Sequence, residues 1–178
     1  EAVDVPALTT RKIPLALVGN VNASAVAEHT LAMILAMAKK LVSYDNATRN
    51  GNFKIRDSFS QTELLGKKIL VAGFGRIGRE VAQRCAAFGM TVMISDPFVT
   101  AEDVKKAGYQ PVEDFHKALP EADYFTIHVP KTPETENLIT AKEIATMKDG
   151  AFLVNVSRGG MINEGDLCDA LSSGKLAA

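Results

Sequence analysis

The front of the chain predicts a short strand and one long helix. Residues 13–18 read IPLALV, an apolar run of strand length, and residues 24–48 carry apolar side chains at helical spacing. Ser24 is a candidate N-cap for this helix, with Glu28 in its first turn. The middle of the helix is apolar on nearly all sides, which predicts burial on more than one side. Residues 49–66 are polar and irregular and predict a linker.

From residue 67 onward, short apolar runs alternate with segments of helical pattern. The runs are apolar almost throughout, as strands covered on both faces are. Strands that alternate with helices are typical of right-handed βαβ units and a parallel sheet. The pattern predicts an α/β fold with a doubly wound, Rossmann-type sheet, preceded by a long N-terminal crossover helix. The predicted strands are KILVA (68–72), TVMIS (91–95), YFTIHV (124–129) and AFLVNV (151–156), and the predicted helices are 76–88, 101–108, 113–119, 140–147 and 163–173.

Composition and charge narrow the class of partner. The chain has 178 residues, of which 47% are hydrophobic and 23% charged, with a formal net charge of −1. This mix is usual for a soluble globular domain with one sizeable core. The near-neutral charge gives no electrostatic reason to expect a nucleic acid or an anionic membrane as partner. The most apolar segment, Leu31–Ala38, is far shorter than the ~20 residues that span a bilayer.

The two cysteines are expected to be packing residues rather than metal ligands. Cys85 and Cys168 have no metal-ligand spacing and lie in predicted helices. We expect both to act as small apolar residues, in a reducing, cytoplasmic setting. The first stretch, EAVDVPALTT, has an acidic start and no long apolar run, so it does not predict a signal peptide.

The segment AGFGRIG, residues 72–78, is the most informative motif. It has the spacing G-x-G-x-x-G, directly after one predicted strand and at the start of a predicted helix. In that context Gly73 allows a tight turn, Gly75 lets a pyrophosphate approach the backbone, and Gly78 lets the helix pack on the strand. The helix N-terminus then offers N–H groups and a partial positive charge to the phosphates, with Arg76 beside them. A glycine-rich turn without a ligand is the weaker alternative.

Asp96 follows the next predicted strand. An acid about 20 residues beyond the glycines accepts hydrogen bonds from the ribose hydroxyls of a dinucleotide. Its charge would repel a 2′-phosphate, and residues 97–99 supply no arginine or lysine to bind one. We therefore expect NAD rather than NADP. Motifs of the types GKS or GKT, HExxH, CxxC and GxSxG do not occur, which removes the commonest triphosphatase, zinc-hydrolase, thiol-redox and serine-hydrolase interpretations.

Polar residues also follow the later strands, where the carboxyl ends of a parallel sheet bind ligands. The segment Asn155 to Arg158 closes one of these strands. An arginine makes paired hydrogen bonds to a carboxylate or a 2-oxo acid, and Gly159 and Gly160 would allow a sharp turn beside it. The pattern alone leaves two interpretations of Arg158 equally open: a substrate-binding side chain, or a solvated charge at a strand end.

The strand before that one ends in His128, Val129 and Pro130. A histidine there is a candidate general base, but the residues after it favour a structural role in which the backbone of 128–130 lines the dinucleotide. Thr132 and Thr135 either cap the next helix or contact the cofactor, and the sequence does not separate these two roles.

These segments together resemble the D-isomer-specific 2-hydroxyacid dehydrogenases, most closely the D-3-phosphoglycerate dehydrogenase branch. The resemblance runs nearly end to end, and its last segment is the most specific. The matching segments are NVNASAVAEHTLAMILAMAK (20–39), ELLGKKILVAGFGRIGREVAQRCAAFGMTV (63–92), SDPF (95–98), ADYFTIHVPKTPETENLI (122–139) and LVNVSRGGMINEGDLCDAL (153–171).

The resemblance implies an NAD-linked oxidoreductase that acts on a small 2-hydroxy or 2-oxo acid. It implies that residues 1–20 are a remnant of a substrate domain and that residues 21–178 are the NAD-binding domain. It also implies a homodimer formed through the helix at 24–48, which would account for its apolar surface. The resemblance assigns Arg158 to the substrate carboxylate and carbonyl, Arg76 and Ile77 to the pyrophosphate, Asp96 to the ribose, and Val129, Val156 and Ser157 to the wall of the cofactor site.

The family places a catalytic glutamate and a catalytic histidine after the segment in which this chain ends. We therefore expect a fragment that binds NAD with little turnover of its own, because general acid–base help typically supplies about 100- to 10,000-fold in rate. The substrate stays open between phosphoglycerate, glycerate with hydroxypyruvate, glyoxylate and lactate. The alternatives are a glyoxylate or hydroxypyruvate reductase of the same family, and an NAD-sensing binding module like the corepressors that use this fold.

Overall fold

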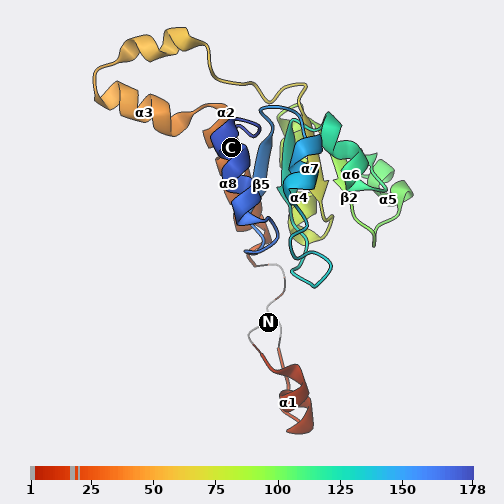
Figure 1. The fold of residues 1–178 in the computed structure, drawn as a ribbon. Helices are drawn as coiled ribbons and strands as arrows, with labels where there is room; N and C mark the ends of the chain where they lie inside the picture. Colours follow the sequence, from red (N-terminus) through yellow and green to blue (C-terminus); the bar gives the residue numbers. More distant parts are fainter. Residues whose placement is uncertain (1–2, 17–18, 20) are drawn as a thin grey trace.

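The computed structural model describes residues 3–16, 19 and 21–178. Its centre is a five-stranded sheet in the order β3-β2-β1-β4-β5, in which every pair of neighbours is parallel (Figure 1). The predicted doubly wound α/β fold is therefore confirmed. The strands are β1 (Lys68–Ala72), β2 (Thr91–Ser95), β3 (Gln110–Pro111), β4 (Tyr124–Ile127) and β5 (Phe152–Asn155).

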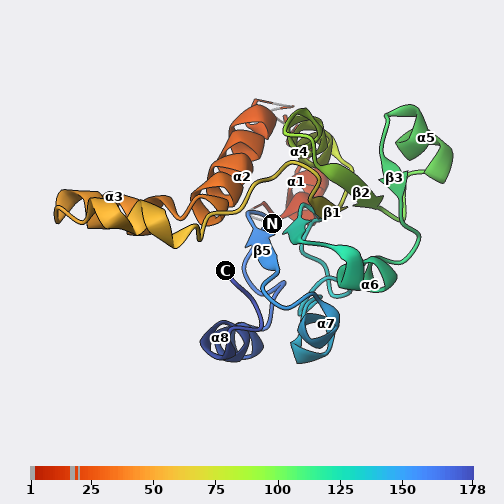
Figure 2. The ribbon, with the colours of Figure 1, turned by 90° about the horizontal axis from the view of Figure 1, so that it is seen from above.

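Helices cover both faces of this sheet, as the view from above shows (Figure 2). One face carries α2 (Ala23–Ala38) and α4 (Arg76–Ala87), and the other carries α6 (Phe115–Ala118), α7 (Ala141–Thr146) and α8 (Glu164–Ser173). The remaining helical elements are α1 (Val5–Thr10), α3 (Leu41–Arg49), α5 (Ala101–Lys106) and the 3₁₀ helices η1 (Phe53–Ser58) and η2 (Leu119–Glu121).

Alternate side chains of β1 enter two separate cores. Ile69 and Val71 pack under α2 and α4, whereas Leu70 and Ala72 pack with α7 and α8 on the opposite face. All four are buried. This two-sided burial explains why the strands are apolar almost throughout rather than at every second position.

Most predicted elements occur at the predicted places. β1 and β2 have the predicted bounds, and β4 and β5 are each two residues shorter than the predicted strands. α8 ends at Gly174, which has a φ of +75° and forms a left-handed C-cap. The pattern missed β3, because two residues that include a proline carry no periodic signal.

The prediction of one long helix over 24–48 is wrong. The helix ends at Ala38, Lys40 has a φ of +50°, and α3 starts at Leu41 in a new direction. The left-handed residue breaks the helical ladder in a way that polarity did not reveal. In Figure 1, α3 extends to one side, away from the sheet.

Two further details of that segment are corrected. The N-cap residue of α2 is Asn22, and Ser24 lies inside the helix, where its hydroxyl accepts a 2.8 Å hydrogen bond from Arg84. Within this chain α2 buries one face, through residues such as Ala27 and Ile34, and exposes Met33 on the other. The expected burial on more than one side is therefore not met by this chain alone.

The first residues also differ from expectation. Residues 13–16 form no strand, and the other two residues of that predicted strand, 17 and 18, lie outside the described residues. α1, which was not predicted, lies well apart from the sheet (Figure 1). The predicted linker at 49–66 contains η1. The division into residues 1–20 and 21–178 stays a prediction.

The two cysteines have different environments. Cys85 is fully buried against the sheet, and burial raises the pKa of its thiol to about 12. Cys168 is exposed on α8, so the prediction that it is a packing residue is wrong.

Among the helices of the described residues, none combines the length and apolar character needed to cross a membrane.

Candidate functional site

The glycine loop joins β1 to α4, and two of its glycines are required by packing. Gly73 has a φ of +95°, and a Cβ there would lie 2.8 Å from the carbonyl oxygen of His128. A Cβ on Gly78 would lie only 2.0 Å from the carbonyl oxygen of Gly73. Both close contacts are possible only for glycine. They hold the start of α4 tightly against β1 and the end of β4.

No described residue requires the third glycine by its packing. A Cβ on Gly75 would meet no atom of the described residues within 4 Å, so the space beside it is open. Gly75 is the N-cap residue of α4, and as a glycine it has no side chain that could cap the helix. The N-terminus of this twelve-residue helix therefore adjoins open space at its N-cap residue. Such an N-terminus, with its partial positive charge, binds anionic groups.

Asp96 connects the end of β2 to this loop. One carboxylate oxygen accepts a 2.6 Å hydrogen bond from the backbone N–H of Phe74, and the other accepts one of 2.8 Å from Phe98. The two strands are neighbours here, since Gly73 donates to the carbonyl of Ser95 at 2.9 Å. Each carboxylate oxygen has a second lone pair, so Asp96 can also accept from hydroxyls of a ligand.

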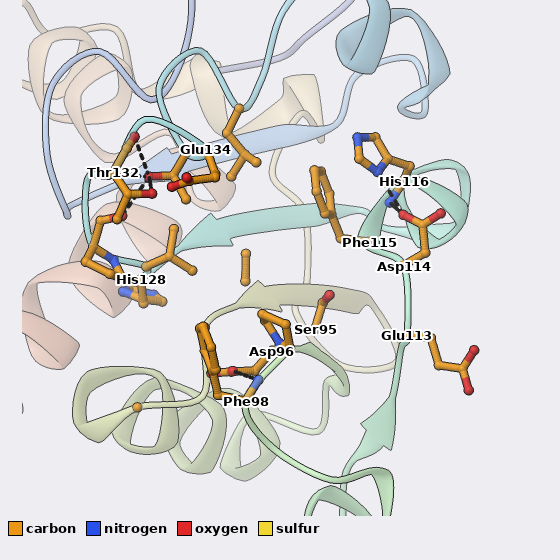
Figure 3. A pocket seen from close by; sticks show the side chains of 18 residues that line it. Ser95, Asp96, Phe98, Glu113, Asp114, Phe115, His116, His128, Thr132 and Glu134 are labelled. Carbon is orange, nitrogen blue, oxygen red and sulfur yellow. Dashed lines mark hydrogen bonds and ion pairs between the residues drawn. The ribbon is translucent and has the colours of Figure 1, made fainter.

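A cavity of about 710 Å³ extends from the glycine loop along the carboxyl edge of the sheet. In Figure 3, Phe98 and Asp96 lie on one side of it, and Phe115 and Thr132 on the other. Of the predicted cofactor residues, Gly73, Gly75, Asp96, His128, Val129 and Pro130 line it; its other lining residues are Ala72, Ser95, Pro97, Phe98, Glu113, Asp114, Phe115, His116, Thr132, Glu134, Thr135 and Leu138.

A smaller cavity of about 140 Å³ adjoins the loop on the side of α2. Arg76 and Ile77 line it together with Gly75 and His128. Gly75 and His128 belong to both cavities, so the two spaces meet at the N-terminus of α4. The structure thus brings Arg76 and Ile77 next to the helix terminus where the sequence predicted phosphate contacts.

His128 is held as a neutral residue. Its Nε2 lies 2.9 Å from the hydroxyl of Thr126, which is buried. Burial of the imidazole lowers the pKa of His128 to about 4. A group that is neutral at pH 7 and so weakly basic is a poor general base. Its backbone is fixed too, since its N–H donates to Ala72 at 2.8 Å. These contacts favour the structural role.

The two threonines in the loop after β4 do not cap the next helix. The N-cap residue of α7 is Thr140. Instead, the hydroxyl of Thr135 donates to the carbonyl of Pro130 at 2.7 Å and accepts from the N–H of Thr132 at 2.8 Å. These bonds fold the loop onto the cavity, which both threonines line.

The segment after β5 is placed differently from the residues around the cavity. Val156 is partly buried against the core, and the hydroxyl of Ser157 lies 2.7 Å from Asn155 Oδ1. Arg158 is exposed, and its Nη1 donates to the carbonyl of Ser157 at 2.8 Å. None of Val156, Ser157 and Arg158 lines either cavity. Their predicted contacts with cofactor and substrate stay predictions.

Sequence reasoning missed the apolar end of the large cavity. Phe98 is 93% exposed and lines the wall of this cavity. Phe115 and Leu138 line the same cavity from the other side of the sheet edge. The signal that could have identified them is their position in the sequence, because all three residues follow carboxyl ends of strands, where ligands bind.

Within the described residues, no group of three or more His, Cys, Asp or Glu could hold a metal ion.

Comparison with known proteins gives a consistent family. Residues 31–178 match the family model described as D-isomer specific 2-hydroxyacid dehydrogenase, NAD binding domain. A D-3-phosphoglycerate dehydrogenase of Archaeoglobus fulgidus is 40% identical over 176 residues, which cover 99% of this chain and 33% of that protein. The chain thus spans about a third of the length of the curated relatives that it matches.

Solved structures agree in fold. The apo structure of D-lactate dehydrogenase from Escherichia coli has a TM-score of 0.86 and 29% identity, with 98% of this chain and 54% of that chain covered. An NAD-dependent formate dehydrogenase from Staphylococcus aureus in complex with NAD has a TM-score of 0.81 and 34% identity, with 90% of this chain and 47% of that chain covered.

Proposed function

Because the chain belongs to the D-isomer-specific 2-hydroxyacid dehydrogenases, as an NAD-binding domain, we propose that the full-length protein oxidises a D-2-hydroxy acid, or reduces the 2-oxo acid, with NAD. The observation that carries this proposal is that the N-terminus of α4 at Gly75 and the carboxylate of Asp96 border one cavity. A dinucleotide needs a phosphate-binding terminus and a ribose acceptor in that combination.

The residues around the cavity fit each part of NAD. The pyrophosphate lies at Gly75, with Arg76 and Ile77 beside it in the adjoining cavity. The adenosine ribose donates hydrogen bonds to Asp96, and the adenine packs between Phe98 and the apolar residues opposite. The nicotinamide half follows the backbone of residues 128–130, whose packing with Gly73 fixes the wall of the site.

The charges of the cavity favour NAD over NADP. Four carboxylates line it, those of Asp96, Glu113, Asp114 and Glu134, and no lysine or arginine is among the lining residues in the described part of the chain. A 2′-phosphate carries up to two negative charges and would meet these acids without a cationic partner.

Arg158 is the proposed substrate-binding residue of this domain. It follows β5 at the same carboxyl edge of the sheet as Asp96 and His128, and the residue is exposed. A guanidinium is always charged and binds a carboxylate through two parallel hydrogen bonds. Bound near the reacting carbon, it also stabilises negative charge that develops on the carbonyl oxygen. NAD, when bound, supplies the acceptor for the hydride that leaves the hydroxyl-bearing carbon.

The proton of the substrate hydroxyl needs a base to accept it. His128 is unsuited to that role, because its imidazole is buried and has a pKa of about 4. We propose that the full-length protein supplies this base after β5 and α8, as the family resemblance implies. We also propose that the full-length protein is cytoplasmic and forms a homodimer.

The substrate within the class stays open. The relatives that share this domain are named for phosphoglycerate, lactate and formate, so the domain does not determine the substrate. A glyoxylate or hydroxypyruvate reductase is equally compatible with the site. No observation favours an NAD-sensing module that lacks turnover.

The test is an Arg158→Gln variant of the full-length protein, assayed with NAD and a panel of D-2-hydroxy acids. We expect kcat/KM to fall by about 100-fold or more, because one charge-assisted bidentate contact is lost. Lys106→Gln, which removes an exposed charge on α5, is the matched control and is expected to change kcat/KM less than twofold. An unchanged kcat/KM of Arg158→Gln for every substrate that turns over would remove Arg158 from the reaction.

A further inference from the structure

The turn that carries Arg158 is built around the side chain of Asn155. We propose that Asn155 is a positioning residue, which sets the direction of the Arg158 guanidinium without touching substrate or cofactor. The inference rests on the proposed role of Arg158 in binding the substrate. It follows from four hydrogen bonds within residues 155–158.

Asn155 bonds to both sides of the turn. Its Oδ1 accepts from the N–H of Ser157 at 3.0 Å and from the hydroxyl of Ser157 at 2.7 Å. Its Nδ2 donates to the carbonyl of Arg158 at 2.8 Å. The amide therefore uses its acceptor and one of its donors on the two residues that follow Val156. An asparagine that bonds to backbone groups two residues on is a recurring way to fix a turn.

The same bonds lead directly to the guanidinium. The carbonyl of Ser157 accepts a 2.8 Å hydrogen bond from Nη1 of Arg158. That carbonyl belongs to the peptide plane between Ser157 and Arg158, which lies between two planes that Asn155 holds, one through the N–H of Ser157 and one through the carbonyl of Arg158. Asn155 thus fixes Ser157, and Ser157 holds one nitrogen of the guanidinium.

Both ends of the turn are anchored. Asn155 is the last residue of β5 and lies in register with Ile127 of β4. Beyond the turn, the N–H of Asn137 donates to the carbonyl of Gly160 at 2.8 Å, and Met161 is fully buried. The backbone before and after Arg158 is therefore fixed, and the Asn155 side chain fixes the exposed residues between.

Direction matters more for arginine than for a point charge. A planar guanidinium binds a carboxylate through two parallel bonds only when its plane faces the ligand. Displacement of such a group by about 1 Å can cost about 100-fold in rate. An exposed arginine on an unsupported turn would lose this alignment in part of the population. Asn155 prevents that loss, which distinguishes it from an asparagine that only stabilises a loop.

A double-mutant cycle on kcat/KM in the full-length protein tests the inference. The variants are Asn155→Ala, Arg158→Ala and the double variant, assayed with the best D-2-hydroxy acid substrate. We expect Asn155→Ala to lower kcat/KM by about 10- to 100-fold in the Arg158 background. In the Arg158→Ala background the same change is expected to cost less than about threefold, because the group that Asn155 positions is gone.

Two further variants keep the test valid if Asn155→Ala folds poorly. Asn155→Asp keeps the acceptor for Ser157 but loses the donor to Arg158, and we expect an intermediate loss of kcat/KM. Asn163→Ala is the matched control: Asn163 caps α8 through the N–H of Asp166 at 3.1 Å, so its loss lowers stability without reaching the turn. It is expected to leave kcat/KM within twofold at a temperature where it is folded.

The outcomes separate the inference from the proposed function. A fall in kcat/KM for Asn155→Ala that is equally large with and without Arg158 overturns the positioning role and leaves the role of Arg158 intact. The same conclusion follows if Asn155→Asp and Asn155→Ala are both as active as the unchanged protein. An Arg158→Ala variant of full activity overturns the proposed role of Arg158, and the inference with it.

Discussion

Asp96 and Phe74 are joined by a 2.6 Å hydrogen bond from the backbone N–H of Phe74 to the Asp96 carboxylate. Phe74 lies between the first two glycines of the loop, and Asp96 follows the neighbouring strand. The residue proposed to hold the ribose therefore also holds the loop proposed to hold the pyrophosphate. Cofactor affinity and loop geometry should depend on the same side chain.

The first prediction concerns replacement of Asp96. Asp96→Ala removes the acceptor for the ribose hydroxyls and for the N–H groups of Phe74 and Phe98. We expect the variant to bind NAD about 10- to 100-fold more weakly, because hydrogen bonds to charged groups contribute about 1.5–3 kcal/mol. NADP should be weakened less, because the repulsion of its 2′-phosphate also falls. Calorimetry of the full-length protein with each cofactor measures both changes. Asp169→Ala, on the surface of α8, is the control. An unaltered ratio of NAD affinity to NADP affinity in Asp96→Ala would contradict the prediction.

The second prediction separates two glycines of the loop. Gly75→Ala places a methyl group in open space, so we expect normal stability but an NAD affinity lower by about tenfold or more, because the methyl group fills the phosphate-binding space. Gly78→Ala drives a Cβ against the carbonyl of Gly73 and should destabilise the fold by about 1–3 kcal/mol or more. Urea unfolding and NAD titration of both variants test this. A stable Gly78→Ala, or a Gly75→Ala that binds NAD normally, would be inconsistent with the geometry.

The sequence predicted the sheet and the loop well because both follow from strong local signals. β1 and β2 each have an apolar centre that is buried on both faces of the sheet, a pattern typical of a covered parallel strand. The glycines at 73 and 78 correspond to contacts that exclude any side chain. Such signals are physical constraints on single positions, and they can be recognised without knowledge of distant residues.

The elements that the sequence did not predict depend on contacts between distant segments or on one dihedral angle. The break at Lys40 is a single left-handed residue in a stretch that is otherwise helical in pattern. The apolar end of the cavity collects Phe98 from the loop after β2, Phe115 from the start of α6 and Leu138 from the segment before α7. The neutral state of His128 depends on burial beside Thr126, which is a property of the packed sheet.

The third prediction follows from that buried histidine. Its folded pKa of about 4 lies below the ordinary 6.5, so between these values the unfolded chain binds a proton that the folded chain does not. Stability is therefore highest above about pH 6.5 and falls as the pH decreases toward 4, by about 1–3 kcal/mol from this group. In His128→Gln, the urea midpoint should depend less on pH between 6.5 and 4.5 than in the unchanged protein.

A second histidine supplies the control for that measurement. His29 is exposed on α2, and His29→Gln makes the same replacement away from the buried site. The three proteins have the same carboxylates, so the difference between the two variant curves isolates the contribution of His128. Equal slopes for His128→Gln and His29→Gln would show that His128 takes up its proton as readily in the folded protein as in the unfolded one.

The fourth prediction concerns the segment that leaves the body of the domain. Val42 on α3 is 72% exposed, and Phe53 and Phe59 in and after η1 are also largely exposed. Single exposed apolar residues are common, but several on one projecting segment are typical of an interaction surface. We propose that a second copy of the chain covers this segment, consistent with the homodimer that the family resemblance implies.

Val42→Asp tests this surface, because a carboxylate buried without a partner at an interface costs several kcal/mol. We expect the dissociation constant of the dimer of the full-length protein to rise by about tenfold or more, as measured by sedimentation equilibrium. Phe88→Asp changes an apolar residue of similar type, 45% exposed at the end of α4, and should leave the dimer unchanged. If both variants dissociate alike, the effect comes from the added charge rather than from the loss of an apolar contact at α3. If neither variant dissociates, the exposed apolar surface of α3 does not form the dimer interface.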